Sequence, residues 1–375
     1  MARTHRPALF VLLAAAAAVC LVSSPLTAQK KVVAITAADA AKDPDFAVQG
    51  EYVGKLSDGD DKETVGLQVV AEGGGKFKGM AYTGGLPGAG WNGEKALAVT
   101  GARKGDVVEF VSENGSGTWK AGQIAVRDKD GNSIGVFKRV VRKSPSLGKK
   151  APKGAVVLFD GSTASHFQGG RLQDGSLREG IRSHRNFQDF HLHMEFKLAY
   201  MPAARGQGRS NSGCYMQGRY EMQILDSFGL AGKHNECGGI YETRDPDLNM
   251  CLPPLQWQTY DVDFTAARYD KQGKKTADAR ITVRHNGVVV HEGAKLPKAT
   301  RASPVREGAD PGPLYIQNHG NPLLFQNIWV VEKREAGFTS VFDGKTLKGW
   351  HKNPQKIGHG TGGRWTVENG VITGE

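Results

Sequence analysis

Residues 218–226 hold the side chains in this sequence that are best suited to chemistry. Apolar and polar residues alternate here, and this period of two predicts a β-strand with two unlike faces. One face carries Tyr220, Met222 and Ile224, and the other carries Glu221 and Gln223. A straight strand would place Asp226 on the apolar face, but a one-residue bulge would turn it toward Glu221 and Gln223. An acid, an amide and an acid on one sheet surface form a set suited to handling a sugar. The plainer alternative is a half-buried strand whose polar side faces water.

The composition favours a β-rich protein. Glycine makes up 50 of the 375 residues, which is about twice its usual share. Short apolar runs separated by Gly, Asn and Asp recur along the chain, whereas long amphipathic helical windows are hard to find. Because many short strands with turn residues between them are typical of sandwiches and barrels, we expect an all-β protein with room for two cores.

The first 28 residues are typical of an export signal. Arg3 and Arg6 precede an apolar run that is too short for a lasting membrane span, and Ala28 offers a cleavage point. We therefore expect an extracytoplasmic protein, periplasmic or secreted, with no integral membrane span after the signal is removed. Removal would lower the net charge from +11 to +9, because the segment contains two arginines and no acidic residue.

Four further segments follow this signal. Residues 29–141 contain several strand runs and predict a small all-β domain, and residues 142–154, rich in Lys, Pro and Gly, predict a linker. Residues 155–335 contain many strand runs and predict a two-sheet sandwich. Residues 336–375 begin a second copy of that unit, because Phe159-Asp160-Gly161 returns as Phe342-Asp343-Gly344. This tail is too short to close another sandwich, so we expect it to be poorly packed or the chain to be a fragment of a longer protein.

The basic residues are scattered along the chain. A nucleic-acid-binding protein would concentrate them on one face with aromatic residues between. Here they form only small clusters, at residues 30–31, 139–143 and 149–150. This pattern favours a solvated basic surface, and we expect no nucleic-acid partner.

Three cysteines follow the signal segment, namely Cys214, Cys237 and Cys251. An oxidising compartment would permit one disulfide among them. A bond between Cys237 and Cys251 would close one loop, but the sequence leaves all three pairings open. Their spacing matches no zinc-binding pattern.

One predicted strand of the sandwich, residues 190–198, alternates strictly between apolar and polar side chains. The residues predicted to face the core are Leu192, Met194, Phe196 and Leu198. His191, His193 and Glu195 then face away from it, and we expect the two histidines to be solvated. Glu195 either faces solvent, pairs with an arginine or joins the acidic set around Glu221.

Several motifs of the second unit occur in the same order in a known family. They are Phe159-Asp160-Gly161-Ser162-Thr163, Asp189 to Glu195, Asn211-Ser212-Gly213, Tyr220 to Asp226, Gly238 to Tyr241 and Asn286-Gly287-Val288. Through these motifs about half of the chain resembles the bacterial 3-keto-disaccharide hydrolase family, described as 3-keto-glucoside 1,2-lyases and 3-keto-2-hydroxy-glucal hydratases. The resemblance implies a concanavalin A-like β-sandwich (jelly roll), here preceded by a smaller all-β domain.

The same fold is similar to that of glucanases that carry Glu-x-Asp-x-x-Glu on a bulged strand. This chain has Glu221-x-Gln223-x-x-Asp226 in what resembles the equivalent place. A retaining glucanase needs its two carboxyl groups about 5–5.5 Å apart, as nucleophile and acid/base. The shorter side chain of Asp226 therefore argues against ordinary retaining hydrolysis.

The resemblance implies an exported carbohydrate-active enzyme that cleaves 3-keto-glucosides or 3-keto-disaccharides. A ketone at C3 acidifies the proton on C2, so a base can remove it and the C1 substituent is then lost by elimination or hydrolysis. Glu221 is the first candidate base, Asp226 is the second, and His319 is a candidate acid or enolate stabiliser. The candidate substrate-binding residues are Asn211, Gln223, Glu195 and Tyr241. We name no cofactor and no metal ligand, although a divalent cation could stabilise the enolate in place of a side chain.

The same sandwich face could instead belong to a non-catalytic, lectin-like module that binds carbohydrate. Its stacking platforms would be Tyr215, Phe228 or Tyr241. Accessible acids gathered around Glu221 would favour the enzyme, whereas acids tied up in salt bridges beside an open aromatic groove would favour the binding module. The presence of Glu221, Gln223 and Asp226 together favours the enzyme, because a lectin has less need of paired acids.

Overall fold

The computed structural model describes residues 32–58, 61–333, 342–348, 350 and 365–374, so the predicted signal segment lies outside the described residues. Among these residues nearly all of the regular structure is β, with one short helix, α1 (Ala37–Ala40), and two 3-10 turns, η1 (Pro44–Ala47) and η2 (Gly206–Gly208). The predicted all-β fold class is confirmed. Within the described ranges, no helix has the length and apolar character needed to cross a membrane.

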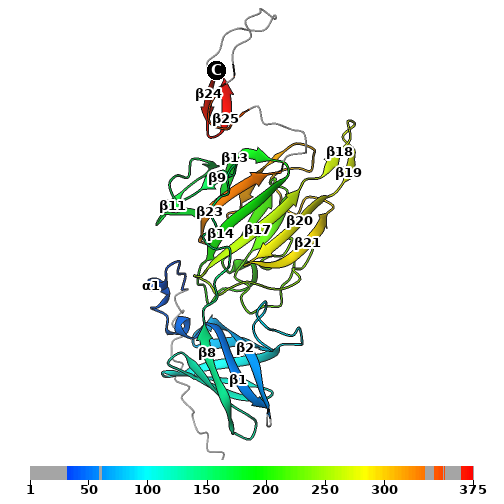
Figure 1. Ribbon diagram of the computed structural model, residues 1–375. Helices are drawn as coiled ribbons and strands as arrows, with labels where there is room; N and C mark the ends of the chain where they lie inside the picture. Colours follow the sequence, from blue (N-terminus) through cyan, green and yellow to red (C-terminus); the bar gives the residue numbers. More distant parts are fainter. Residues whose placement is uncertain (1–31, 59–60, 334–341, 349, 351–364, 375) are drawn as a thin grey trace, which may run out of the picture. The chain divides into compact units, whose positions relative to one another are not determined.

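The N-terminal domain is a closed barrel in which each strand pairs with the next along the chain (Figure 1). Its strands are β1 (Gly50–Asp58), β2 (Asp61–Gly73), β3 (Lys76–Thr83), β4 (Leu97–Lys104), β5 (Val107–Ser112), β6 (Gly115–Lys120), β7 (Gln123–Arg127) and β8 (Ser133–Val140). The last strand closes the barrel by pairing with the first, with Tyr52 opposite Arg139. Because a closed barrel leaves no free edge, every strand is paired on both sides.

The second domain is a sandwich of two antiparallel sheets. The smaller sheet has the order β10 (Phe167–Gln168), β13 (Ile181–Phe187), β22 (Gly312–Ile316), β15 (Ser212–Met216) and β16 (Tyr220–Ile224). The larger sheet has the order β11 (Leu172–Gln173), β12 (Ser176–Arg178), β23 (Leu323–Glu332), β14 (Phe190–Leu198), β17 (Trp257–Thr265), β20 (Ala279–His285) and β21 (Val288–Leu296), and β9 (Val156–Phe159) pairs with β23. Two small hairpins complete the described strands, β18 (Arg268–Tyr269) with β19 (Lys275–Ala277) and β24 (Trp365–Glu368) with β25 (Val371–Gly374).

One continuous hydrophobic core lies between the two sheets. Strand β16 contributes Tyr220, Met222 and Ile224 to it. Strand β14 contributes every second residue from Phe190 to Leu198. Both strands therefore follow the alternation read from the sequence, and their polar residues point to the outer faces of the sandwich.

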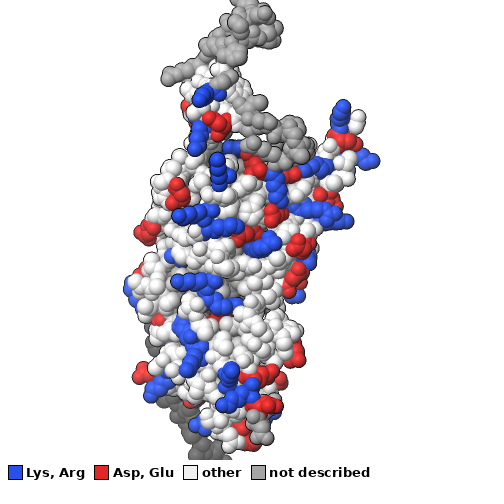
Figure 2. Space-filling view, in the orientation of Figure 1, with Lys and Arg blue, Asp and Glu red and all other residues white. Residues whose placement is uncertain are grey.

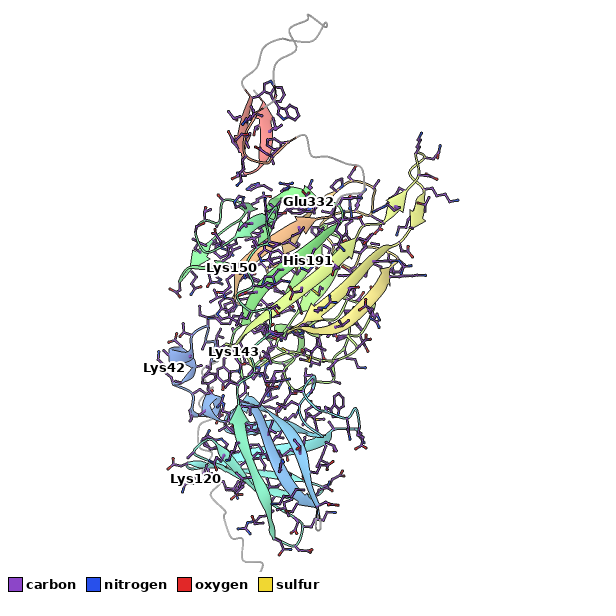
Figure 3. All side chains as sticks on the ribbon, viewed as in Figure 1. Lys42, Lys120, Lys143, Lys150, His191 and Glu332 are labelled. Atoms are coloured by element: carbon purple, nitrogen blue, oxygen red, sulfur yellow. The ribbon has the colours of Figure 1, made fainter. Side chains whose placement is uncertain are left out.

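The outer face of the larger sheet is covered where His193 lies, and the expectation that this histidine is solvated is wrong. His193 is fully buried, with Nδ1 at 2.8 Å from Asp261 Oδ1 and Nε2 at 3.3 Å from Glu195 Oε1. The backbone N–H of Gly148 donates to Glu195, and the Ser146 hydroxyl donates to Asp261. The predicted linker, residues 142–154, thus lies across this face and excludes water from it. Figure 3 labels Lys143 and Lys150 within this segment and His191, which stays partly exposed, on β14.

The three cysteines are buried free thiols. The Cys237 thiol lies 3.2 Å from the Tyr260 hydroxyl, and it also forms a hydrogen bond with the Cys251 thiol. The structure therefore places Cys237 and Cys251 next to each other as free thiols, with no disulfide between them.

Part of the predicted second copy can be described. Strands β24 and β25 pair as a hairpin in which Trp365 is 55% exposed, and residues 336–341, 349, 351–364 and 375 lie outside the described residues.

On the face drawn in Figure 2, acidic and basic side chains are interspersed.

Candidate functional site

The outer face of the smaller sheet positions the predicted site. Strands β15 and β16 pair without a register shift, with Tyr215 opposite Glu221 and Gly213 opposite Gln223. These four residues share the outer face, because their neighbours along each strand, such as Cys214 and Met222, belong to the core. The strand alternation alone therefore brings a carboxyl, an amide and a phenol together.

Glu221 is the carboxyl at the centre of this face. Its side chain lies over Gly213, and a Cβ atom at that position would fall 2.1 Å from Glu221 Oε1. Only glycine therefore leaves room for the carboxyl group. The Tyr215 hydroxyl forms a hydrogen bond with Glu221, and Gln317 Nε2 donates to the same hydroxyl at 3.2 Å. Gln317 thus positions the phenol, and Gly213 leaves the space that the carboxyl group occupies.

The electrostatic state of Glu221 differs from that of an ordinary surface carboxyl. The residue is 3% exposed, and burial raises its pKa from 4.5 to about 7, with the Tyr215 hydrogen bond opposing the rise. Burial and the neighbouring Glu221 also raise the pKa of the Tyr215 hydroxyl far above its ordinary value. A carboxyl with a pKa near 7 exchanges protons easily at neutral pH, which is the property of a general base.

Two amides lie beside Glu221, joined by Gln207. Asn211 Nδ2 donates to Gln207 O at 2.8 Å, and Gln223 Nε2 donates to Gln207 Oε1 at 2.9 Å. Both residues are 1% exposed, and the oxygens Asn211 Oδ1 and Gln223 Oε1 have no hydrogen-bond partner among the described residues. Buried acceptors are normally satisfied in proteins. These two amide oxygens are exceptions to that rule.

Asp226 does not join Glu221. Strand β16 ends at Ile224, and its pairing from Tyr220 onward contains no bulge. Asp226 is buried and accepts a hydrogen bond from Arg209 Nε at 2.7 Å. Its charge acts on the buried thiols of Cys237 and Cys251, whereas it is not among the causes of the raised pKa of Glu221. The described strand therefore leaves Asp226 on the core side, where it neutralises a buried arginine.

Glu195 belongs to the other sheet. It lies on β14 and is fully buried, and it accepts hydrogen bonds from Asn327 Nδ2 and Gln326 Nε2, both at 2.7 Å. Burial alone would raise the pKa of Glu195, but the hydrogen bonds from His193, Asn327 and Gln326 lower it below its ordinary value. Glu195 serves the buried network under residues 142–154, so the structure does not bring it together with Glu221.

The two remaining predicted residues lie on segments that border the Glu221 face. Tyr241 is half-buried, and its backbone N–H donates to Glu221 O at 3.1 Å. His319 is exposed in the loop between β22 and β23. That loop is attached to the site, because Asn321 Oδ1 accepts the backbone N–H of Asn211 at 2.9 Å.

The stacking platforms proposed for a lectin-like module are mostly inaccessible. Tyr215 is fully buried and Phe228 is 2% exposed, so neither ring can offer a face to a sugar. Tyr241 remains half-buried, as does Tyr315, whose ring centroid lies 5.3 Å from that of Tyr215.

Sequence reasoning missed three residues of this site, namely Gln207, Tyr315 and Gln317. Gln207 lies in a short 3-10 turn without any periodic signal, so its contacts with both amides could not be anticipated. The other two could have been found by alternation, because Tyr315 and Gln317 alternate with the apolar Leu314 and Ile316. Within the described residues, no group of three or more His, Cys, Asp or Glu side chains is placed to hold a metal ion.

A comparison with family models found one match, which lies over the sandwich. Residues 154–331 match the model of the 3-keto-alpha-glucoside-1,2-lyase-like domain. The match confirms the predicted resemblance of this part of the chain to the 3-keto-disaccharide hydrolase family.

Two solved structures are similar to this chain. One is described as a "putative glycosyl hydrolase" from Parabacteroides distasonis; it is 29% identical, with a TM-score of 0.45, and the match covers 49% of this chain and 85% of that one. A second protein of the same description and organism is 19% identical, with a TM-score of 0.36, covering 52% of this chain and 99% of that one. A search of curated proteins found no match.

Proposed function

We propose that the lyase-like domain cleaves glucosides or disaccharides oxidised at C3, with Glu221 as the base that removes the proton on C2. The observation that carries this proposal is the buried Glu221 carboxyl, whose pKa is raised to about 7 on the outer face of the sheet. General bases work best when their pKa lies near the working pH. Asp226 is not needed in this scheme, because its carboxylate is already paired with Arg209.

The proposed reaction is an elimination. The ionised Glu221 takes the C2 proton, and the electrons of the broken C2–H bond form an enolate with the C3 carbonyl. As the carbonyl reforms, a double bond forms between C1 and C2 and the bond from C1 to the leaving oxygen breaks. The leaving alkoxide takes a proton and departs as an alcohol. Water can then add to the unsaturated sugar, which completes a net hydrolysis.

The neighbouring residues have proposed roles in binding and proton transfer. Asn211 Oδ1 and Gln223 Oε1 would accept hydrogen bonds from sugar hydroxyls, because both are buried acceptors without a partner among the described residues. The Tyr215 hydroxyl would orient the Glu221 carboxylate by donating a hydrogen bond to it. His319 remains our candidate for stabilising the enolate or protonating the leaving group, since its loop is joined to Asn211.

We also propose that the protein is exported by its first 28 residues. The proposal is supported by the sequence pattern of charged start, apolar run and small residue at the cleavage point.

The test uses the purified protein with a 3-keto-disaccharide in deuterated water. Deuterium incorporation at C2 reports proton abstraction, and ultraviolet absorbance of the unsaturated keto sugar reports elimination. We expect both signals with the wild type, neither with Glu221→Gln, and both with Glu292→Gln, a control at an exposed carboxyl on β21. Repeating the assay with a chelator shows whether a divalent cation takes part. Sugar binding without exchange or turnover would overturn the proposal in favour of a lectin-like module.

A further inference from the structure

The N-terminal barrel contains a large cavity that is separate from the Glu221 site. Its volume is about 1050 Å³. This is slightly above the usual range for small-molecule sites, about 300–1,000 Å³. An eight-stranded barrel is just wide enough either to be filled by its own side chains or to hold one small ligand. Which of the two applies depends on the residues that point inward.

One end of this barrel is filled by its own side chains. Tyr52, Val69, Phe77, Val108 and Trp119 are buried and belong to a single hydrophobic cluster. The Tyr52 and Trp119 side chains are also joined by a hydrogen bond of 3.1 Å between the indole Nε1 and the hydroxyl. This end is a packed core and offers no space to a ligand.

Phe110, Ile124 and Phe137 form a floor in the middle of the barrel. They can extend across it because inward-facing glycines lie next to them. A Cβ atom at Gly101 would fall 2.5 Å from the Phe110 ring, and one at Gly117 would fall 2.9 Å from Ile124. In the strand register Phe110 lies between the two glycines, opposite Gly101 on β4 and opposite Gly117 on β6. All three floor residues line the cavity.

The walls above this floor are apolar and incompletely covered. Leu56, Val65, Ala81, Val99 and Val126 point into the barrel, line the cavity and are only half-buried. In a barrel filled by its own side chains these inward positions would be buried. Binding of an apolar ligand would displace water from these side chains, and this burial of apolar surface would favour binding.

The rim is polar and carries both signs of charge. The charged lining residues include both signs, so no single ionic charge is strongly favoured at the opening; they are Glu63, Glu113, Asp128, Asp130, Lys95, Arg127 and Lys129. The hydroxyl-bearing residues Thr83 and Ser112 also line the opening. A ligand with an apolar body and an uncharged, hydrogen-bonding end matches this distribution.

We propose that the barrel binds one small uncharged amphiphile, with its apolar part above the Phe110 floor and its polar end at the rim. Nothing in this proposal depends on the reaction of the sandwich. The cavity and the Glu221 site lie in different domains, so Glu221→Gln leaves the affinity of the barrel for its ligand unchanged.

The first experiment titrates the full-length protein with N-phenyl-1-naphthylamine, an uncharged probe that fluoresces in apolar surroundings. We expect saturable binding of one probe per chain, and displacement by 1-decanol at a concentration at least tenfold lower than by decanoate at pH 8. Binding that does not saturate would overturn the site. Equal displacement by the alcohol and the carboxylate would overturn the assignment of an uncharged ligand.

Variants on one strand locate the probe. Val99→Trp fills the cavity and lowers probe affinity at least tenfold, whereas Thr100→Trp on the exposed outer side of β4 leaves it unchanged. Circular dichroism checks that both variants fold. If Val99→Trp does not fold, Ala81→Leu replaces it, with a smaller expected loss of affinity. Unchanged affinity in a folded cavity-filling variant would contradict the proposal.

Discussion

Replacing Glu221 by glutamine tests both the raised pKa of this carboxyl and its role as the base. The change removes the ionisable group and keeps the shape of the side chain over Gly213. Two measurements follow from the pKa of about 7, one of stability and one of activity. They are independent, because the first requires no substrate.

The stability effect can be worked from the pKa. A rise from 4.5 to about 7 corresponds to about 3 kcal/mol, at about 1.4 kcal/mol for each unit. Because the folded state holds this proton more tightly than the unfolded state, the stabilisation is fully present below pH 4.5 and is lost as the pH rises through 7. The wild type therefore loses about 3 kcal/mol of unfolding free energy from Glu221 over this window, and Glu221→Gln does not.

The assay is urea unfolding at pH 4.5 and at pH 8.5. From pH 4.5 to pH 8.5, the unfolding free energy of Glu221→Gln should rise by about 3 kcal/mol relative to that of the wild type. The unfolding free energy of Glu292→Gln, an exposed control, should follow that of the wild type. In the activity assay, kcat/KM of the wild type should rise tenfold for each pH unit up to about 7 and then level. Glu221→Gln should lower kcat by about 10²–10⁴-fold. Parallel stability changes in the wild type and Glu221→Gln, or a wild-type inflection near pH 4.5, would refute the reasoning.

Three further substitutions separate the roles of the neighbouring groups. Tyr215→Phe removes the hydrogen bond that opposes the raised pKa of Glu221, so the inflection of the kcat/KM profile should move to higher pH; a shift to lower pH would contradict this contact. Asp226→Ala leaves Arg209 buried without its partner and should cost about 3–5 kcal/mol of stability, measured by urea unfolding; a loss of activity at unchanged stability would instead give Asp226 a catalytic role. His193→Ala removes the centre of the network under residues 142–154 and should speed trypsin cleavage within that segment; an unchanged cleavage rate would mean that other contacts hold it.

The alternation of side chains made much of the sandwich predictable. The strand predicted over residues 190–198 is β14 (Phe190–Leu198), and the core set of β16 is the one read from residues 220–224. Such patterns follow from local geometry, because successive side chains of a strand point to opposite faces. The same rule placed Glu221 and Gln223 together on the outer face.

Alternation could not say what covers an outer face. His193 points away from the core as predicted, yet it is buried because residues 142–154 lie over it. That segment has no regular structure and no periodic pattern, so its contacts depend on tertiary folding. The same limit applies to Gln207, whose 3-10 turn brings two amides together, and to the barrel cavity, whose existence depends on how far Phe110 and Phe137 reach across the lumen.

The position of Asp226 is relevant to which kind of sugar chemistry we propose for this fold. A retaining hydrolase needs a second carboxyl about 5–5.5 Å from the first, and two carboxyls so close raise one another's pKa. The raised pKa of Glu221 has burial as its cause, with no acidic neighbour contributing to it, while Asp226 neutralises Arg209 on the core side of the strand. A single buried carboxyl beside a phenol and an amide lacks the nucleophile and acid pair of a retaining hydrolase, which is consistent with our proposal that Glu221 removes a proton next to a ketone. The spacing Glu221-x-Gln223-x-x-Asp226 thus resembles a glucanase motif in sequence, whereas in the structure Asp226 pairs with Arg209 and Glu221 lies opposite Tyr215.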